Sequence, residues 1–188
     1  MDDQQITQML LNPETQRQGF EAAVRQYGEQ LYWQVRKIVL THDDADDVVQ
    51  NAFLKAWNAL DTFGGDSKAF TWLSRIAINE ALDLLRKNKR RMTVSGDEYS
   101  VASSLLADPY FDGTETEALL QEAIAQLPDV QRTVFTLRYY DEMKYSELSK
   151  LTGTSEGALK ASYHIAVKKI SEYVLNHSAN TTSNKKTI

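Results

Sequence analysis

The sequence predicts an all-α protein of two small helical domains joined by a flexible acidic linker, the second domain containing a helix-turn-helix. Strong helix formers fill long segments in which apolar residues recur at three-and-four spacing, and the chain has only three prolines. This periodicity disappears over residues 93–113, which carry acidic side chains but neither Lys nor Arg. A short turn at residues 152–154 separates the last two helical patterns. We therefore expect domains at residues 1–92 and 114–176, a linker at 93–113, and a disordered tail at 177–188.

Composition excludes several classes of protein. The chain has no cysteine, which rules out disulfides and thiolate metal sites, and its three histidines lack metal-ligand spacing. We expect no metal, no cofactor and no enzymatic activity. Neither a secretory signal nor an apolar run of membrane-spanning length is visible, so we expect a cytoplasmic protein without direct membrane insertion. The net charge of −5 is unevenly spread, because a basic run at residues 86–91 precedes the acidic linker, so nucleic-acid binding is compatible with it.

The first two helical patterns differ in what they expose. Residues 13–39 carry one apolar stripe, formed by Phe20, Val24, Tyr27, Leu31, Val35 and Ile38. Residues 43–60 carry a broad apolar face, and the opposite face holds Asp43, Asp47, Gln50, Asn51 and Asn58 around Leu54. A leucine framed by carboxylates and amides is typical of a helix that binds a protein partner. The alternative is an isolated surface leucine, which is common and carries no function.

A glycine-containing loop and a long helix follow. Asp66 or Ser67 is expected to cap a helix that runs to about Arg90 and ends in the basic run. Cations at a helix C-terminus complement the helix dipole, but this run is denser than that role requires. The pattern therefore indicates a surface that binds phosphates.

The second domain has the features of a helix-turn-helix. Pro128 separates two helices near its start, and a short helix at 145–151 precedes the turn. Ser149 is the small residue expected at the helix crossing, Gly153 the turn residue and Ser155 the cap of the last helix, from residue 155 to about 175. The expected packing set is Leu148, Leu151, Leu159 and Ile165. The alternative is a helical hairpin whose polar face is simply solvated.

Taken together, these segments resemble a known family, the extracytoplasmic-function (ECF) type of the sigma-70 class. The resemblance is collinear over residues 20–174. Residues 43–57 resemble the helix that docks on the clamp helices of the polymerase β′ subunit, and residues 70–87 resemble the helix that meets the −10 promoter element. Leu127-Pro128 and residues 146–170 resemble the domain that binds the −35 element.

The resemblance implies partners and roles for individual residues. The expected partners are core RNA polymerase (its β′ clamp helices and β subunit), promoter DNA and an anti-sigma factor. The polymerase-binding residues would be Asp47, Gln50, Asn51 and Leu54. Residues 63–68 would form a loop that holds a flipped base, and the −10 contacts would be Phe63, Gly64, Gly65, Lys68, Trp72, Arg75, Asn79, Arg86, Lys87, Lys89 and Arg90. Asp83 would orient neighbouring side chains. The −35 contacts would be Thr154, Ser155, Glu156, Lys160, Tyr163, His164 and Lys168.

The sequence departs from the family pattern at two places, and two other hypotheses compete with the sigma-factor hypothesis. Ile78 occupies a position where many relatives carry a basic residue, and the last helix is poorer in arginine than is common. A dimeric helix-turn-helix regulator that acts without stable polymerase binding would share the second domain but leave residues 43–91 unexplained. Residues 43–47 also have the DDxxD spacing of magnesium-binding helical enzymes, although carboxylates at a helix N-terminus stabilise the dipole without metal.

Overall fold

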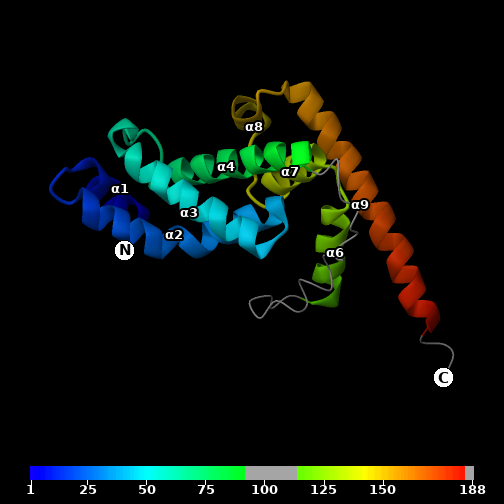
Figure 1. Cartoon of the computed structure of the whole chain (residues 1–188). Helices are drawn as coiled ribbons and strands as arrows, with labels where there is room; N and C mark the ends of the chain where they lie inside the picture. Colours follow the sequence, from blue (N-terminus) through cyan, green and yellow to red (C-terminus); the bar gives the residue numbers. More distant parts are fainter. Residues whose placement is uncertain (92–113, 185–188) are drawn as a thin grey trace. The chain divides into compact units, whose positions relative to one another are not determined.

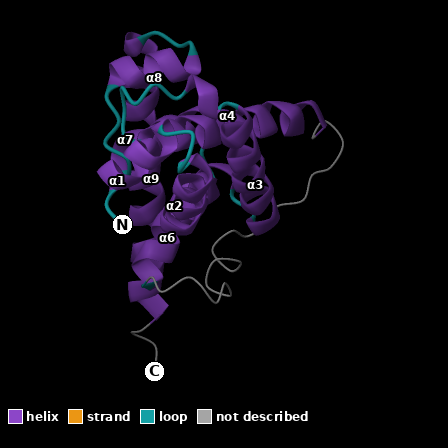
Figure 2. Cartoon of the chain, turned by 90° about the vertical axis from the view of Figure 1, so that its left-hand side faces the viewer, coloured by secondary structure: helices purple, strands orange, loops and turns teal. Residues whose placement is uncertain are grey.

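The computed structural model describes residues 1–91 and 114–184, and every regular element in that part of the chain is a helix (Figure 2). The predicted linker lies outside the described residues. The chain divides into two compact units, Met1–Ser95 and Gly96–Ile188, as the all-α, two-domain prediction expects. None of the described helices is long and apolar enough to cross a membrane.

Unit 1 is a bundle built on three long helices. In chain order it contains α1 (Asp3–Leu11), α2 (Gln16–Val39), α3 (His42–Asn58), the short 3-10 helix η1 (Leu60–Thr62) and α4 (Ala69–Arg91) (Figure 1). Helices α2, α3 and α4 pack against one another, and α1 lies against both α2 and α4. The predicted stripe on α2 is buried at Tyr27, Leu31, Val35 and Ile38, whereas Val24 is exposed.

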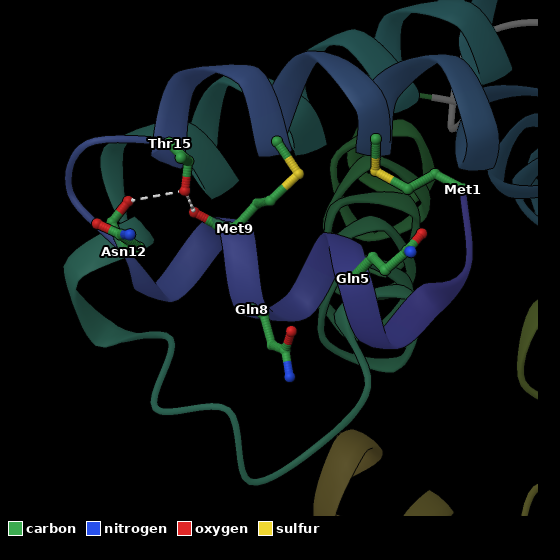
Figure 3. A pocket seen from close by; sticks show the side chains of 6 residues that line it. All are labelled: Met1, Gln5, Gln8, Met9, Asn12 and Thr15. Carbon is green, nitrogen blue, oxygen red and sulfur yellow. Dashed lines mark hydrogen bonds between the residues drawn. The ribbon is translucent and has the colours of Figure 1, made fainter.

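Helix α1 is not among the helices expected from the sequence, the first of which begins near residue 13. Asp2 caps it through a reciprocal arrangement with Gln5, in which each side chain accepts a hydrogen bond from the other residue's backbone N–H. Ile6 and Leu10, four residues apart, are buried against the bundle. A shallow pocket of about 420 Å³ opens beside this helix, lined by Met1, Gln5, Gln8, Met9, Asn12 and Thr15 (Figure 3).

Unit 2 contains α6 (Glu115–Ala125), α7 (Asp129–Tyr139), α8 (Tyr145–Thr152) and α9 (Glu156–Asn184). Thr114 and Glu117 form a capping box at the start of α6, and α9 packs against the other three helices. Its core is formed by Ala123, Ile124, Leu127, Phe135, Ala166 and Ile170. The prediction of a disordered tail from residue 177 is wrong as far as residue 184, because α9 continues to Asn184.

Candidate docking and nucleic-acid interfaces

Helix α3 has two sharply different faces. Ala45, Val48, Ala52 and Ala56 are at most 3% exposed and pack into unit 1, whereas Leu54 on the other side is 63% exposed. The four predicted polymerase-binding residues Asp47, Gln50, Asn51 and Leu54 are all exposed. The structure thus places them on one accessible face, which we call the α3 outer face; its binding role stays a prediction.

The acidic start of α3 is used locally. Thr41 caps the helix by accepting a hydrogen bond from the Asp44 backbone N–H at 3.2 Å, and Asp46 pairs with His42 at 3.3 Å. Within residues 1–91 and 114–184, no three His, Asp or Glu side chains are grouped so that they could hold a metal ion. Carboxylates in this position stabilise the helix dipole.

The loop between η1 and α4 is anchored at its first residue. Phe63 is only 6% exposed, and its ring lies 4.9 Å from that of Trp72, centroid to centroid. Its side chain is therefore part of the core and is not presented to a base, which corrects the prediction that Phe63 contacts DNA. Gly64 and Lys68 are exposed, and Gly65 has φ +76°, in the left-handed region that favours glycine. Trp72 is itself half-buried.

The cap of α4 also differs from expectation. The helix begins at Ala69, directly after Lys68, so neither Asp66 nor Ser67 occupies the N-cap position. Instead, the Ala69 backbone N–H donates to the hydroxyl of Thr7 in α1 at 3.3 Å. The first backbone N–H of α4 is thus satisfied by a side chain more than sixty positions earlier in the sequence. Sequence patterns that consider only neighbouring residues would instead expect a local N-cap residue to accept this hydrogen bond.

The polar face of α4 presents the predicted basic and amide residues. Arg75, Asn79, Arg86 and Lys87 are exposed, whereas Lys89 and Arg90 belong to the helix but their side chains lie outside the described part. Asp83 accepts a hydrogen bond from the Arg86 guanidinium at 2.7 Å; that it orients neighbouring side chains for DNA binding stays a prediction. Ile78 is fully buried, so the position that is often basic in relatives faces the core here.

The turn of unit 2 has the predicted helix-turn-helix geometry. Gly153 ends α8 with φ +69°, and its N–H donates to the Ser149 carbonyl at 2.9 Å. Ser155 caps α9, its hydroxyl accepting from the Ala158 N–H at 3.4 Å. Leu148 and Leu159 are buried as expected. Ile165 is 44% exposed, so its assignment to the packing set is wrong; Ala166, seven residues after Leu159, fills that place.

One exposed stripe runs along α9. Glu156, Lys160, His164 and Lys168 are spaced by four residues and are all exposed, so they line one side of the helix, the α9 stripe. Ser155 is exposed and Thr154 half-buried at the start of the helix. Tyr163 departs from prediction: it is half-buried, and its ring stacks on Phe135 at 5.8 Å, with 14° between the planes. It packs unit 2 together rather than facing outward with the stripe.

Comparison with known proteins places the chain in a family. Residues 23–91 match the model of sigma-70 region 2, and residues 117–170 match that of sigma-70 region 4. The chain is 30% identical to the RNA polymerase sigma-H factor of Pseudomonas aeruginosa, over 85% of this chain and 86% of that protein. It is 31% identical to the ECF RNA polymerase sigma factor SigW of Bacillus subtilis, over 78% of this chain and 83% of that protein.

Two solved structures share the fold. One is the sigma factor RpoE of Bartonella quintana in complex with the anti-sigma factor NepR, with a TM-score of 0.66 and 23% identity over 82% of this chain and 96% of that chain. The other is CnrH in complex with the cytosolic domain of CnrY, with a TM-score of 0.61 and 25% identity over 90% and 95%. The region 2 match covers residues 43–91, which the rival dimeric regulator left unexplained. The chain belongs to the sigma-70 family, as an RNA polymerase sigma factor of the ECF type.

Proposed function

We propose that this sigma factor binds core RNA polymerase through the α3 outer face and directs it to promoters that unit 1 and unit 2 read together. The observation that carries this proposal is Leu54, a leucine 63% exposed at the centre of an otherwise polar face whose helix is packed on its other side. Apolar side chains of this kind, once enclosed by a partner, supply most of the energy of an interface. The family resemblance assigns the β′ clamp helices to this face, and the β subunit as a further polymerase contact.

Unit 1 is proposed to open and read the −10 element. The loop at residues 63–68 would enclose a base flipped out of the non-template strand, with the exposed Gly64 and Lys68 nearest to it. Arg75 and Asn79 on α4 suit contacts to bases and backbone. Arg86 and the cations after it suit phosphates, which makes this binding dependent on salt.

Unit 2 is proposed to read duplex DNA of the −35 element with the α9 stripe. A helix after a tight turn enters the major groove with its first residues toward the base edges, which assigns Ser155, Glu156 and Lys160 to bases and the later Lys168 to phosphate. The chain carries a net charge of −5, so each unit alone is expected to bind DNA weakly. Polymerase holds the two units at a defined separation and so converts two weak sites into one strong one.

The proposal also covers location and inhibition. We expect the protein to act in the cytoplasm, where core polymerase and promoters are found. The two solved relatives were each captured with a partner, in one case a named anti-sigma factor and in the other the cytosolic domain of CnrY. We propose that an anti-sigma factor likewise controls this chain, by covering the surfaces that bind polymerase.

Run-off transcription tests the proposal. Purified core polymerase is supplied with genomic fragments and either the wild-type chain or the double variant Asp47→Arg, Leu54→Arg. A matched control is Glu29→Arg, Leu175→Arg, which reverses an exposed carboxylate on α2 and replaces a leucine on α9 that is 68% exposed. We expect new transcription starts with the wild type and the control, and none with the α3 variant.

Two outcomes would contradict the proposal. Equal loss in both double variants would show that the α3 outer face has no special role. Sequence-specific binding by the free protein, without measurable binding to core polymerase, would favour the dimeric regulator instead. Sedimentation of each variant with core polymerase separates loss of docking from loss of promoter recognition.

A further inference from the structure

The loop at residues 63–68 is fixed from two sides. At its start, Phe63 is buried against Trp72 of α4, which ties the loop to the helix that follows it. Two further contacts, one to the loop and one to the residue after it, come from α1. Helix α1 lies outside residues 23–91, the part that matches sigma-70 region 2.

Thr7 makes the first contact from α1. Its hydroxyl donates to the Asp3 carbonyl at 2.8 Å and accepts from the Ala69 backbone N–H at 3.3 Å. A hydroxyl has one proton and two lone pairs, so it makes both hydrogen bonds at once. The first backbone donor of α4, directly after the loop, is thereby held at a defined place relative to α1.

Leu11 makes the second contact, in the middle of the loop. A Cβ atom added to Gly65 would lie 2.8 Å from the Leu11 Cδ1 atom, so the leucine side chain covers the backbone of Gly65. Gly65 has φ +76° and no side chain of its own to define its position. Leu11 therefore restricts Gly65, one of the two glycines that give this loop its conformational freedom.

Helix α1 is itself firmly placed, which it must be to hold another segment. Ile6 and Leu10 are buried in the bundle, and the Tyr27 hydroxyl of α2 donates to the Asp3 carboxylate. In the close view, the loop passes below α1 while Met1 and Met9 point toward α2 on the other side of the helix (Figure 3). The helix thus connects the bundle to the loop.

We propose that α1 is a positioning element for −10 recognition: Thr7 and Leu11 hold the backbone of residues 64–68 in the conformation that encloses the flipped base. Neither side chain contacts DNA in this proposal, and both act through the loop. The inference rests on the proposed promoter function, since it assigns residues that position the same loop behind those that contact the base.

The test uses holoenzyme assembled from core polymerase and the full chain. Once run-off transcription has identified a promoter, its −10 element is randomised, and the sequences retained in heparin-resistant open complexes are counted for the wild type, Thr7→Val and Leu11→Ala. Thr7→Ser keeps the hydroxyl and serves as the rescue variant. Thr15→Val is the matched control, because its hydroxyl donates to the Met9 carbonyl at 3.1 Å and not to the loop at residues 63–68.

We expect Thr7→Val to reduce the preference for the best base about fivefold at a single −10 position, the effect of losing one capping hydrogen bond on a conformational equilibrium. Leu11→Ala should weaken the same position. Affinity for core polymerase and preference at the −35 element should stay at wild-type values, and Thr7→Ser should restore −10 preference.

Wild-type preference at every position in Thr7→Val and Leu11→Ala would overturn the inference. So would an equal, uniform loss in Thr7→Val and Thr15→Val, which would indicate general destabilisation of α1. A wild-type chain that supports no initiation would refute the proposed function itself, and the two failures are therefore distinguishable.

Discussion

Arg132 is a buried cation that joins two helices of unit 2. Its side chain is 6% exposed, and its guanidinium donates to the carbonyl of Leu127 at 3.0 Å and to that of Ala125 at 3.4 Å, both at the end of α6. It also pairs with Asp129 at 2.7 Å. Burial lowers the pKa of the Arg132 guanidinium from its ordinary value and Asp129 opposes that shift, but an arginine stays charged at neutral pH. Arg132 therefore caps α6 and fixes the start of α7.

The cost of Arg132→Ala follows from these contacts. A hydrogen bond from a charged donor contributes about 1.5–3 kcal/mol, and the substitution removes this donor from the buried Leu127 carbonyl and from the partly buried Ala125 carbonyl. The pairing with Asp129 adds little, because that carboxylate is 44% exposed and water screens it. We expect a loss of about 3 kcal/mol in the unfolding free energy of unit 2, and less than about 1 kcal/mol for Asp129→Asn.

The positions of the tryptophans allow the two units to be followed separately. Trp33, Trp57 and Trp72 all lie in unit 1, so tryptophan fluorescence reports that unit, whereas far-UV circular dichroism reports the helices of both. In urea titrations, Arg132→Ala should lower the midpoint of the unfolding transition of unit 2, which is seen by circular dichroism and not by fluorescence. The midpoint of the fluorescence transition, which reports unit 1, should stay the same. Its control is Arg138→Ala, on the same helix, whose guanidinium donates to the carbonyls of Glu142 and Met143 near the surface.

Because the Arg138 hydrogen bonds are more open to water, its replacement should cost only about 1 kcal/mol. Equal costs for the two arginine variants would show that burial of the guanidinium is not what matters. A loss of unfolding free energy in Asp129→Asn as large as that in Arg132→Ala would also refute the reasoning. It would show that the ion pair with Asp129, and not the hydrogen bonds to the two carbonyls, is the main contribution of Arg132 to stability.

Three further predictions follow from single residues. Gly153→Ala should cost about 1 kcal/mol of stability from backbone strain at φ +69° alone, since nothing lies within 4 Å of an added Cβ. Gly65→Ala, at φ +76°, should cost about the same, because the atom nearest to its added Cβ is the end of the exposed Leu11 side chain, which can move aside; thermal unfolding compares the two. Burial and the Asp3 carboxylate raise the pKa of Tyr27, so its stabilisation of unit 1 is present below about pH 10, where the unfolded phenol ionises, and is lost as pH rises further. Tyr27→Phe should therefore flatten the decline of the urea midpoint between pH 9 and 11, read by tryptophan fluorescence, and an unchanged slope would contradict this assignment. Lys168→Ala should weaken holoenzyme binding to all promoters alike and reduce the slope of log affinity against log salt by about one, whereas a loss limited to certain −35 sequences would make Lys168 a base-reading residue.

Periodicity predicted the features that depend on a single helix. The α3 outer face follows from the spacing of its alanines and valines, and the turn at Gly153 follows from the need for a left-handed residue between two helices. Ile165 was misplaced because its hydrophobicity outweighed its spacing; counting seven residues from Leu159 leads to Ala166, which is the buried residue.

Features that depend on a partner outside the same helix were not predictable in this way. An aromatic residue in a DNA-binding motif is compatible with stacking on a base or with burial, and only the presence of Trp72 beside Phe63, and of Phe135 beside Tyr163, decides between them. Arginine side chains are mostly exposed in proteins, yet two carbonyls at the end of α6 make the burial of Arg132 possible. The one local signal that was overlooked is the capping box of Asp2 and Gln5, which marks the start of α1.

The dependence of the loop on α1 bears on how promoter preference evolves in such a chain. Gly64 and Lys68, the loop residues proposed to face DNA, are exposed, and exposed loop residues tolerate substitution. In our proposal, Thr7 and Leu11 determine the conformation in which these residues meet a base. Two chains with the same loop sequence and different residues at these two positions should therefore differ in −10 preference. Exchanging residues 63–68 alone between relatives should transfer preference incompletely, and exchanging them together with α1 should transfer it fully. Complete transfer by the loop alone would show that the loop carries its own conformation and that α1 contributes only to the stability of unit 1.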